Sequence, residues 1–468
     1  MESENRNILG TGDIKRLMVK FAVPNIVAML VGALYNIVDQ FFIGREVGIL
    51  GNAATNVAFP FTTSCVAIAL LFGIGGASSF NLAMGRGEKD KAAYYVGNAA
   101  SMLVISGIVL FAVATIFLRP MLMLFGLMEE VLAYAMPYVR ITAFGFPFLI
   151  LTTGGGHLMR ADGSPGMTML CSITGAVINT VLDAIFVVGF KWGMEGAAIA
   201  TVIGQVVSGI MVIVYLSRYK TVKLFPKHFR PSLHCVGGIA MLGTASFFNQ
   251  IAIMIVQVVM NNLMSYYGAL SQCGESIPLS CSGVVIKVSQ VMFSIVIGIS
   301  QGTQPIESFN YGAQRYSRVK AAYRYALYAG GAVAVISFLL YQIFPRQIIS
   351  IFGQDGGEMY FEFGVRFFRI YLFGAIVSFM QPITSTFFTS IGKAYKGIFL
   401  SLTRQIIFLL PATLILAYYK GIDGIMYAGP IAEFAAFLVS VIMIAIEMSK
   451  INKLEQALLT EEKSAVGV

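Results

Sequence analysis

Four long stretches of this chain contain no charged residue, and they constrain its fold more than any other feature. They cover residues 47–85, 235–274, 370–392 and 405–419. A helix crosses the hydrocarbon core of a bilayer with about 20 predominantly apolar residues, so these runs have the length of membrane spans. Over the whole chain only 12% of the residues are charged, whereas roughly a quarter are charged in soluble proteins. We therefore expect an integral membrane protein without a sizeable soluble domain.

Glycines, prolines and charge clusters divide the 468 residues into twelve predicted transmembrane helices, so the expected fold class is all-α. The predicted spans are 18–43, 53–83, 92–118, 133–160, 166–190, 193–217, 235–266, 275–308, 321–345, 358–390, 396–420 and 422–446. The first span is too long for the core of a signal peptide and lacks a small-residue cleavage pattern. It is therefore expected to remain in the mature protein.

The lysines and arginines predict the orientation of these spans. If the N-terminus is cytoplasmic, 21 of the 32 basic residues fall in cytoplasmic segments and five fall in outer loops. Basic residues are enriched in the cytoplasmic loops of membrane proteins. We therefore expect a multi-pass protein of the plasma or inner membrane with both termini in the cytoplasm. The basic residues of the cytoplasmic loops then explain the formal charge of +9, so we expect the lipid bilayer as a partner and no nucleic acid.

The chain divides near its midpoint into two similar halves. A polar, basic segment at 218–234 separates a first six-helix lobe at 1–217 from a second at 235–450, and a cytoplasmic tail follows at 451–468. At an offset of 229, residues 73–94 match residues 302–323 at nine of 22 positions. An even number of helices per repeat gives both copies the same orientation, related by a pseudo-twofold axis along the membrane normal. Transporters with parallel repeats place their substrate site at the repeat interface.

The sequence motifs of enzymes and metal proteins are missing from the chain. It has no GxxxxGK[ST] string for a nucleotide, its five cysteines lack CxxC spacing, and its three histidines form no paired cluster. An intramembrane aspartyl protease is disfavoured as well, because neither Asp39 nor Asp183 lies in a GxGD string. We therefore expect no enzymatic activity and no resident cofactor.

Two aspartates lie deep in predicted spans, where an ionisable group is costly and usually functional. Asp39, Asp183 and Thr201 fall at similar depth below the outer ends of their helices, and Tyr35 and Asn179 precede the two aspartates by one turn. Together these five residues predict an oxygen-rich pocket in the first lobe. The pocket would bind a proton, or a sodium ion ligated by Asp39, Asn179, Asp183 and Thr201. The alternative is that each aspartate only forms a hydrogen bond to a neighbouring helix.

Three strings in the sequence resemble conserved motifs of the multidrug and toxic compound extrusion (MATE) transporters. They are DQFFIG at 39–44, RADGSP at 160–165 and QPIESFNYGA at 304–313. The resemblance covers essentially the whole chain. It implies two six-helix bundles around a central cleft, and export of organic cations or amphipathic drugs in exchange for protons or sodium.

By position, the resemblance assigns cation coupling to Tyr35, Asp39, Asn179, Asp183 and Thr201. It also assigns a conformational hinge to Pro24, and a monomer is expected.

The second lobe departs from the family pattern in its polar residues. Some branches carry acids in the seventh and tenth spans, but here those spans offer amides, and the tentative cleft residues are Gln250, Gln257, Asn261 and Gln381. Four further ionisable residues are Lys287, Arg404, Glu433 and Glu307. We expect Arg404 and Glu433 to form an ion pair that stabilises the lobe, and Glu307 to face water at the end of its helix.

Two other functions remain as alternatives. A flippase for lipid-linked oligosaccharides or lipid II has a related architecture, but an anionic cargo would need several cations in the cleft, and only Lys287 and Arg404 are available. A receptor without transport activity is disfavoured because the sequence has no soluble domain to receive a signal.

Overall fold

The structure is a computed structural model, and it describes residues 8–47, 49–124, 129–272, 274, 276–352 and 357–466. Within these residues it contains twelve helical spans long and apolar enough to cross a membrane, which confirms the predicted number and the all-α class. The helices of the first half are α1 (Ile8–Thr11), α2 (Ile14–Glu46), α3 (Ile49–Gly85), α4 (Lys89–Ile116), α5 (Leu118–Leu124), α6 (Glu129–Thr142), η1 (Ala143–Gly145), α7 (Phe146–Ala161), α8 (Pro165–Asp183), the π-helix η2 (Ala184–Gly189) and α9 (Gly193–Ser217).

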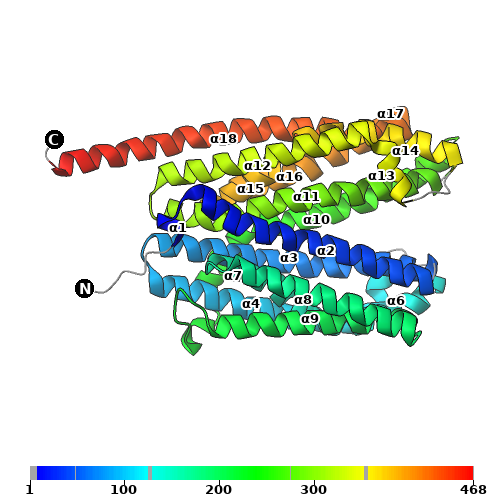
Figure 1. Cartoon of the computed structure of the whole chain (residues 1–468), viewed down its shortest axis with the longest axis horizontal. Coiled ribbons are helices and arrows are strands. Elements are labelled where there is room, and N and C mark those ends of the chain that lie inside the picture. The colour runs from blue at the N-terminus through cyan, green and yellow to red at the C-terminus, as the bar shows by residue number, and fades with distance from the viewer. Residues whose placement is uncertain are drawn as a thin grey trace.

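The second half repeats this plan after the short η3 (Pro226–Phe229). Its helices are α10 (Leu233–Ala269), α11 (Ser276–Gly312), α12 (Tyr316–Ile343), α13 (Pro345–Phe352), α14 (Gly357–Tyr371), η4 (Leu372–Ile376), α15 (Met380–Ser390), α16 (Ala394–Leu402), the π-helix η5 (Thr403–Leu409), α17 (Leu410–Lys420) and α18 (Ile422–Val466). Figure 1 shows α2–α9 and α10–α18 as two bundles side by side, with α1 and the C-terminal part of α18 at the same end. That end is called the α1 end below.

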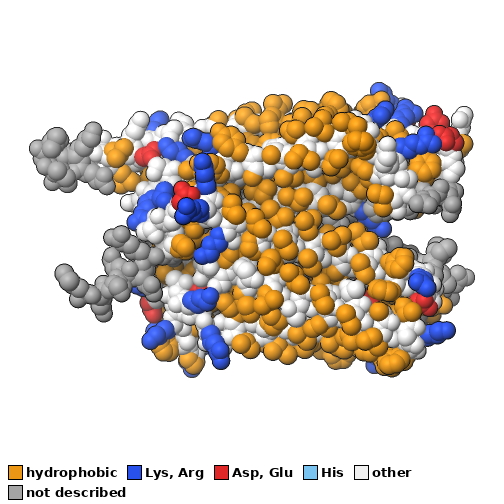
Figure 2. Space-filling view, viewed as in Figure 1, with side chains coloured by type: hydrophobic (Ala, Val, Ile, Leu, Met, Phe, Trp, Pro, Cys, Tyr) orange, Lys and Arg blue, Asp and Glu red, His pale blue; other side chains and the backbone are white. Residues whose placement is uncertain are grey.

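The outer surface of both bundles is apolar in its middle. Figure 2 shows a broad hydrophobic band, with Lys, Arg, Asp and Glu gathered at the two ends of the molecule. Large apolar side chains of the long helices are exposed, for example Ile336 on α12 and Leu438 on α18. An exposed apolar belt of this extent is stable only against lipid, which is consistent with the twelve spans.

The last helix is longer than its sequence pattern predicts. The predicted span ended at residue 446, but α18 continues without a break to Val466. Residues 447–466 lack glycine and proline and consist mainly of Glu, Lys, Leu, Ala and other good helix formers, so nothing in them stops a helix that has already started.

The two lobes approach most closely through glycines in the halves of their helices near the α1 end. A Cβ atom on Gly75 would overlap the carbonyl oxygen of Ile239, and one on Gly243 would overlap that of Leu71. The α2–α11 contact is similar, because a Cβ on Gly302 would lie 2.7 Å from the Cα atom of Ala22. Small residues allow helix backbones to approach closely in membranes. These contacts hold the lobes together at the α1 end.

Polar side chains reinforce the same junction between the lobes. The Asn25 amide donates to the Gly298 carbonyl at 2.9 Å, and the Gln304 amide donates to Ser78 Oγ at 2.7 Å. Arg160 donates to the Gln301 side chain at 3.5 Å. The structure therefore has its lobes joined across the α1 end by both backbone packing and hydrogen bonds.

The helix ends give a different repeat offset from the sequence match. Gly85 and Gly312 end α3 and α11, and each packs against the opposite helix, so they are counterparts 227 positions apart. Pro165 and Ala394, which begin α8 and α16, are 229 positions apart. The offset is therefore not constant, and the sequence match of 73–94 with 302–323 is displaced by two residues from the structural correspondence.

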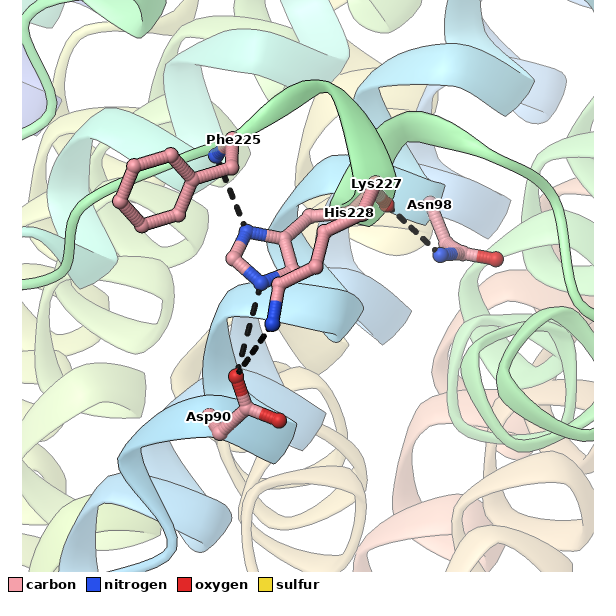
Figure 3. A network of polar contacts seen from close by, with 5 residues as sticks. All are labelled: Asp90, Asn98, Phe225, Lys227 and His228. Atoms are coloured by element: carbon pink, nitrogen blue, oxygen red, sulfur yellow. Dashed lines mark hydrogen bonds and ion pairs between the residues drawn. The ribbon is translucent and has the colours of Figure 1, made fainter.

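The segment between the lobes is anchored to the first lobe through η3, as Figure 3 shows. The Asn98 side chain donates to the His228 carbonyl at 2.9 Å, and His228 Nδ1 accepts from the Phe225 N–H at 3.1 Å. The Asp90 carboxylate lies 3.4 Å from Lys227 Nζ and 3.6 Å from His228 Nε2. Because Nδ1 is an acceptor, Nε2 carries the ring proton and points at Asp90.

Candidate cation-coupling site

Asp39 and Asp183 lie together inside the first lobe. Asp39 projects from α2 with 8% of its surface exposed, and Asp183 ends α8 and is fully buried. Their carboxyl groups are within hydrogen-bonding range of each other. Asp183 stands directly before the π-helix η2, a helix type that often occurs at functional sites. The two predicted residues, 144 positions apart in the sequence, therefore form one buried pair.

Asn179 and Thr201 complete one side of the pair. The Asn179 amide lies 3.2 Å from Thr201 Oγ1, and its other end lies 3.1 Å from Asp183 Oδ2. With the amide nitrogen turned toward Asp183, the nitrogen donates to the carboxylate and the oxygen accepts from Thr201. This orientation gives both neighbours a hydrogen bond. Asn179 thereby links Asp183 to Thr201 on α9.

Two tyrosines border the aspartate pair, and one of them was not predicted. Tyr35 lies one turn before Asp39 on α2 and interacts electrostatically with both aspartates, as predicted from its position. Tyr138 on α6 also interacts with both aspartates and with Tyr35. Its position in a predicted span was visible in the sequence, but no spacing linked it to Asp39 or Asp183. The site is thus built from α2, α6, α8 and α9.

The aspartate pair has no basic partner among the residues that the structure describes. None of the ion pairs found there includes Asp39 or Asp183. One oxygen of each carboxyl group is also without a hydrogen-bond partner. Two adjacent buried carboxylates cannot both remain charged without compensation, because burial of an unpaired ion is very costly.

The donor set around the pair fits a small hard cation. It offers two carboxylates, one amide oxygen and hydroxyl oxygens, which are suitable ligands for sodium, and the carboxyls alone can share a proton. No group of three or more His, Cys, Asp and Glu side chains with metal-binding geometry occurs in the described part of the chain. The site is therefore unlike a transition-metal centre and suits a proton or sodium.

Pro24 lies in the half of α2 near the α1 end, while Asp39 lies in the other half. Asp39 follows Pro24 by fifteen positions, which corresponds to about 22 Å of helix. Proline removes one backbone hydrogen bond inside a helix and so creates a point where the helix can bend. The neighbouring Asn25 is bonded to Gly298 of the second lobe. A change at Asp39 can therefore reach the lobe junction through a single helix.

The second lobe has apolar residues where the first has its acids. Ala22 and Ile239 hold equivalent places at the glycine contacts, so Asp39 corresponds to Val256. The offset of α8 and α16 places the counterpart of Asp183 near the start of α17 (Leu410–Lys420), which contains no acid. Val256 belongs to a small buried apolar cluster with Leu409, Ala428 and Ala432. The first lobe alone contains the paired-acid arrangement among the residues described.

The predicted cleft residues do not all lie together. Gln250, Gln257 and Asn261 share one face of α10 and are partly buried. Gln381, in contrast, is buried on α15, and its amide donates to the Leu400 carbonyl at 2.9 Å. Gln381 therefore serves helix packing within the second lobe.

Of the two predictions for the other ionisable residues of the second lobe, one is confirmed and one is wrong. Arg404 Nη1 lies 2.9 Å from Glu433 Oε1, so the predicted ion pair is confirmed. Glu307 was expected to face water, but it is only 2% exposed and bonds to Ser390. The prediction was wrong because depth along α11 was judged alone, without the α15 side chains that cover this end. Lys287 is exposed.

Two six-helix repeats, a close junction between them and an unneutralised acidic site inside one repeat are together typical of a secondary membrane transporter. The chain belongs to the MatE family, whose model matches residues 24–185 and 245–415. It is thus a transporter of the MATE type, in agreement with the motifs at 39–44, 160–165 and 304–313.

Known proteins agree with this assignment over almost the full length. The multidrug export protein MepA of Staphylococcus saprophyticus is 21% identical over 452 residues, which cover 95% of this chain and 96% of MepA. A MATE protein solved in complex with MaL6 superposes with a TM-score of 0.89 at 21% identity, covering 95% of this chain and 99% of that one. A second structure is described as the outward-facing conformation of a multidrug resistance MATE transporter. It has a TM-score of 0.89 at 21% identity and covers 96% of this chain and 99% of the other.

Proposed function

We propose that this transporter is a secondary active antiporter that exports organic cations or amphipathic drugs in exchange for protons or sodium. The observation that carries the proposal is the buried Asp39–Asp183 pair, which has no basic partner among the described residues and therefore calls for a mobile cation. The full-length similarity to a protein named as a multidrug exporter supports drugs as the cargo.

The proposed cycle alternates access to the two sides of the membrane. A cation bound between Asp39 and Asp183 offsets their negative charge. When the cation leaves, an uncompensated buried carboxylate remains, which is costly in the same conformation. An ion can shift the balance between two conformations only if it binds one of them better than the other. Bending of α2 at Pro24 would link the state of Asp39 to the contacts of Asn25 with Gly298, and so to the junction between the lobes.

The orientation in the membrane follows from the same proposal. The α1 end carries most of the basic residues, so we place it in the cytoplasm with both termini. The structure, with its lobes in close contact at the α1 end, would then represent a state closed toward the cytoplasm.

The flippase alternative receives no support from the second lobe. An anionic lipid-linked cargo would require several free cations, but Arg404 is already paired with Glu433 and stacks over the Phe293 ring at 4.5 Å, which leaves only Lys287 of the two. Drug export therefore remains the function that the described residues favour.

Extrusion of a fluorescent dye from cells, or its uptake into everted vesicles, tests the proposal. Asp39→Asn and Asp183→Asn should each abolish ion-driven export while the purified protein keeps its size-exclusion profile. Asp423→Asn is a matched control, because Asp423 forms a partly exposed ion pair with Arg366 far from the site, and it should export normally. Near-normal export by both site variants would refute the assignment. Proton and sodium gradients imposed separately then identify the coupling ion.

A further inference from the structure

A cavity opens at the α1 end of the first lobe, on the opposite side of Pro24 from the aspartate pair. It has a volume of about 390 Å³, and its walls come from α2, from the start of α8 and from the segment after α9. The lining residues are Lys20, Pro24, Gly163, Ser164, Pro165, Gly166, Met167 and Lys220.

The cavity combines two lysines with hydrogen-bond donors. The Lys220 ammonium donates to Ser164 Oγ at 2.9 Å, which directs its charge toward the cavity wall. Lys20 lines the cavity from α2 and is exposed, and no ion pair of the described residues includes Lys20 or Lys220. The first N–H groups of α8, among them that of Gly166, add positive partial charge on the same side.

Asp162 precedes the lining residues Gly163 and Ser164 in the sequence but is not itself part of the lining. Asp162 is buried, and its two oxygens accept hydrogen bonds from the Tyr215 hydroxyl at 2.6 Å and from the N–H groups of Lys220 and Thr221. The Thr221 hydroxyl bonds to it as well. These bonds hold the carboxylate inside the protein, so the cavity itself presents the two ammonium groups.

The position of the cavity along the spans corresponds to the lipid headgroup layer. The span of α8 and η2 has 25 residues, about 37 Å of helix, against roughly 30 Å of hydrocarbon. It begins at the α1 end, where charged side chains replace the apolar band (Figure 2), so we place its first residues at the level of the headgroups. Deeper along the same helices, Val23 on α2 and Leu170 on α8 are each about half exposed on the apolar belt. A molecule in the cavity would thus meet positive charge at its polar end and an apolar surface below it.

We propose that this cavity binds the phosphate group of an anionic phospholipid in the leaflet at the α1 end. The two lysines and the N–H groups of α8 would contact the phosphate, and Met167, Val23 and Leu170 would lie along the acyl chains. Because Pro24 forms part of the wall, a bound lipid favours the α2 conformation in which the cavity has this shape. The proposal does not depend on the identity of the coupling ion or of the cargo.

The test measures lipid binding to the purified full-length protein by native mass spectrometry. Phosphatidylglycerol should bind more tightly than phosphatidylcholine. Each lysine near an anionic headgroup contributes a factor of about five, so the Lys20→Gln/Lys220→Gln variant should bind phosphatidylglycerol about 30-fold more weakly. The control Lys223→Gln/Lys453→Gln removes the same charge from exposed positions outside the cavity and should stay within about twofold of the parent.

A second variant fills the cavity without changing any charge. A Cβ on Gly166 meets no atom within 4 Å, so Gly166→Leu is accommodated and projects into the site. It should lose phosphatidylglycerol binding while the protein elutes normally. Unchanged binding in both cavity variants, or an equal loss in the lysine control, would overturn the proposal. Displacement of the lipid by inorganic phosphate would assign the site to free phosphate and overturn the lipid assignment.

Discussion

The buried pair of Arg404 and Glu433 allows a quantitative test of how this membrane protein tolerates charge. The side chains are only 12% and 16% exposed, and their closest atoms are 2.9 Å apart. Removing one member of a buried pair leaves an uncompensated charge and costs about 3–5 kcal/mol. Arg404→Gln should therefore destabilise the protein by about 3 kcal/mol or more, because it leaves the Glu433 carboxylate alone.

The two single variants should differ in a defined order. After Glu433→Gln, the Arg404 guanidinium still stacks over the Phe293 ring at 4.5 Å, and such a contact contributes about 1 kcal/mol at a partly desolvated site. Glu433→Gln should therefore cost about 1 kcal/mol less than Arg404→Gln. The double variant, with two neutral amides, should lie within about 1 kcal/mol of the parent because no buried charge remains.

Reversible unfolding by SDS in mixed micelles, followed by circular dichroism, measures these free energies in a double-mutant cycle. The Arg366–Asp423 pair serves as the control, since its side chains are 55% and 39% exposed and its loss should cost less than about 1 kcal/mol. Additive losses at Arg404 and Glu433, with the double variant the least stable, would refute the reasoning.

Three further variants probe the site and the lobe junction. Tyr138→Phe removes the unpredicted hydroxyl beside Asp39 and Asp183. It should weaken the apparent affinity for the coupling ion several-fold in transport assays without loss of folded protein. An unchanged ion dependence would contradict the assigned contact. Gly243→Leu places a side chain against the Leu71 backbone and should separate the lobes at the α1 end, which increased cysteine labelling at that end would detect. In the control Gly237→Leu the new side chain meets open space, and labelling should not increase. Glu307→Lys buries a cation beside Ser390 and should reduce the yield of folded protein, whereas Glu307→Gln should be tolerated; equal yields would contradict the buried position of Glu307.

The sequence predicted the parts of this molecule that depend on local chemistry. Charge-free runs, together with glycines, prolines and charge clusters as boundaries, predicted all twelve spans because a bilayer disfavours charge in the middle of a helix. The depth of Asp39 and Asp183 suggested one pocket, and the structure brings the two carboxyls together with Asn179 and Thr201. Depth was enough to predict this contact because helices that cross the same bilayer run roughly parallel, so residues at equal depth can meet.

Features that depend on packing between helices were not predictable in this way. Tyr138 reaches the aspartates only because α6 packs beside α9, and Glu307 is buried only because α15 covers it. The repeat offset differs by two residues near Gly85, since sequence identity does not record the glycine contacts that relate the lobes. The predicted end of α18 came too early because it followed the apolar composition, which stops near residue 446. The polar residues that follow have equally high helix propensity, so the helix continues.

Exchange of cargo for a cation requires that the drug displaces the ion bound by Asp39 and Asp183, and one measurement tests this directly. Drug added to purified, ion-loaded protein in weakly buffered detergent should release protons, or sodium if sodium is the ion, in proportion to the drug bound. This release is expected for the parent protein and should be absent in the Asp39→Asn/Asp183→Asn variant. Equal release from both proteins, or drug binding without any release from the parent, would contradict it.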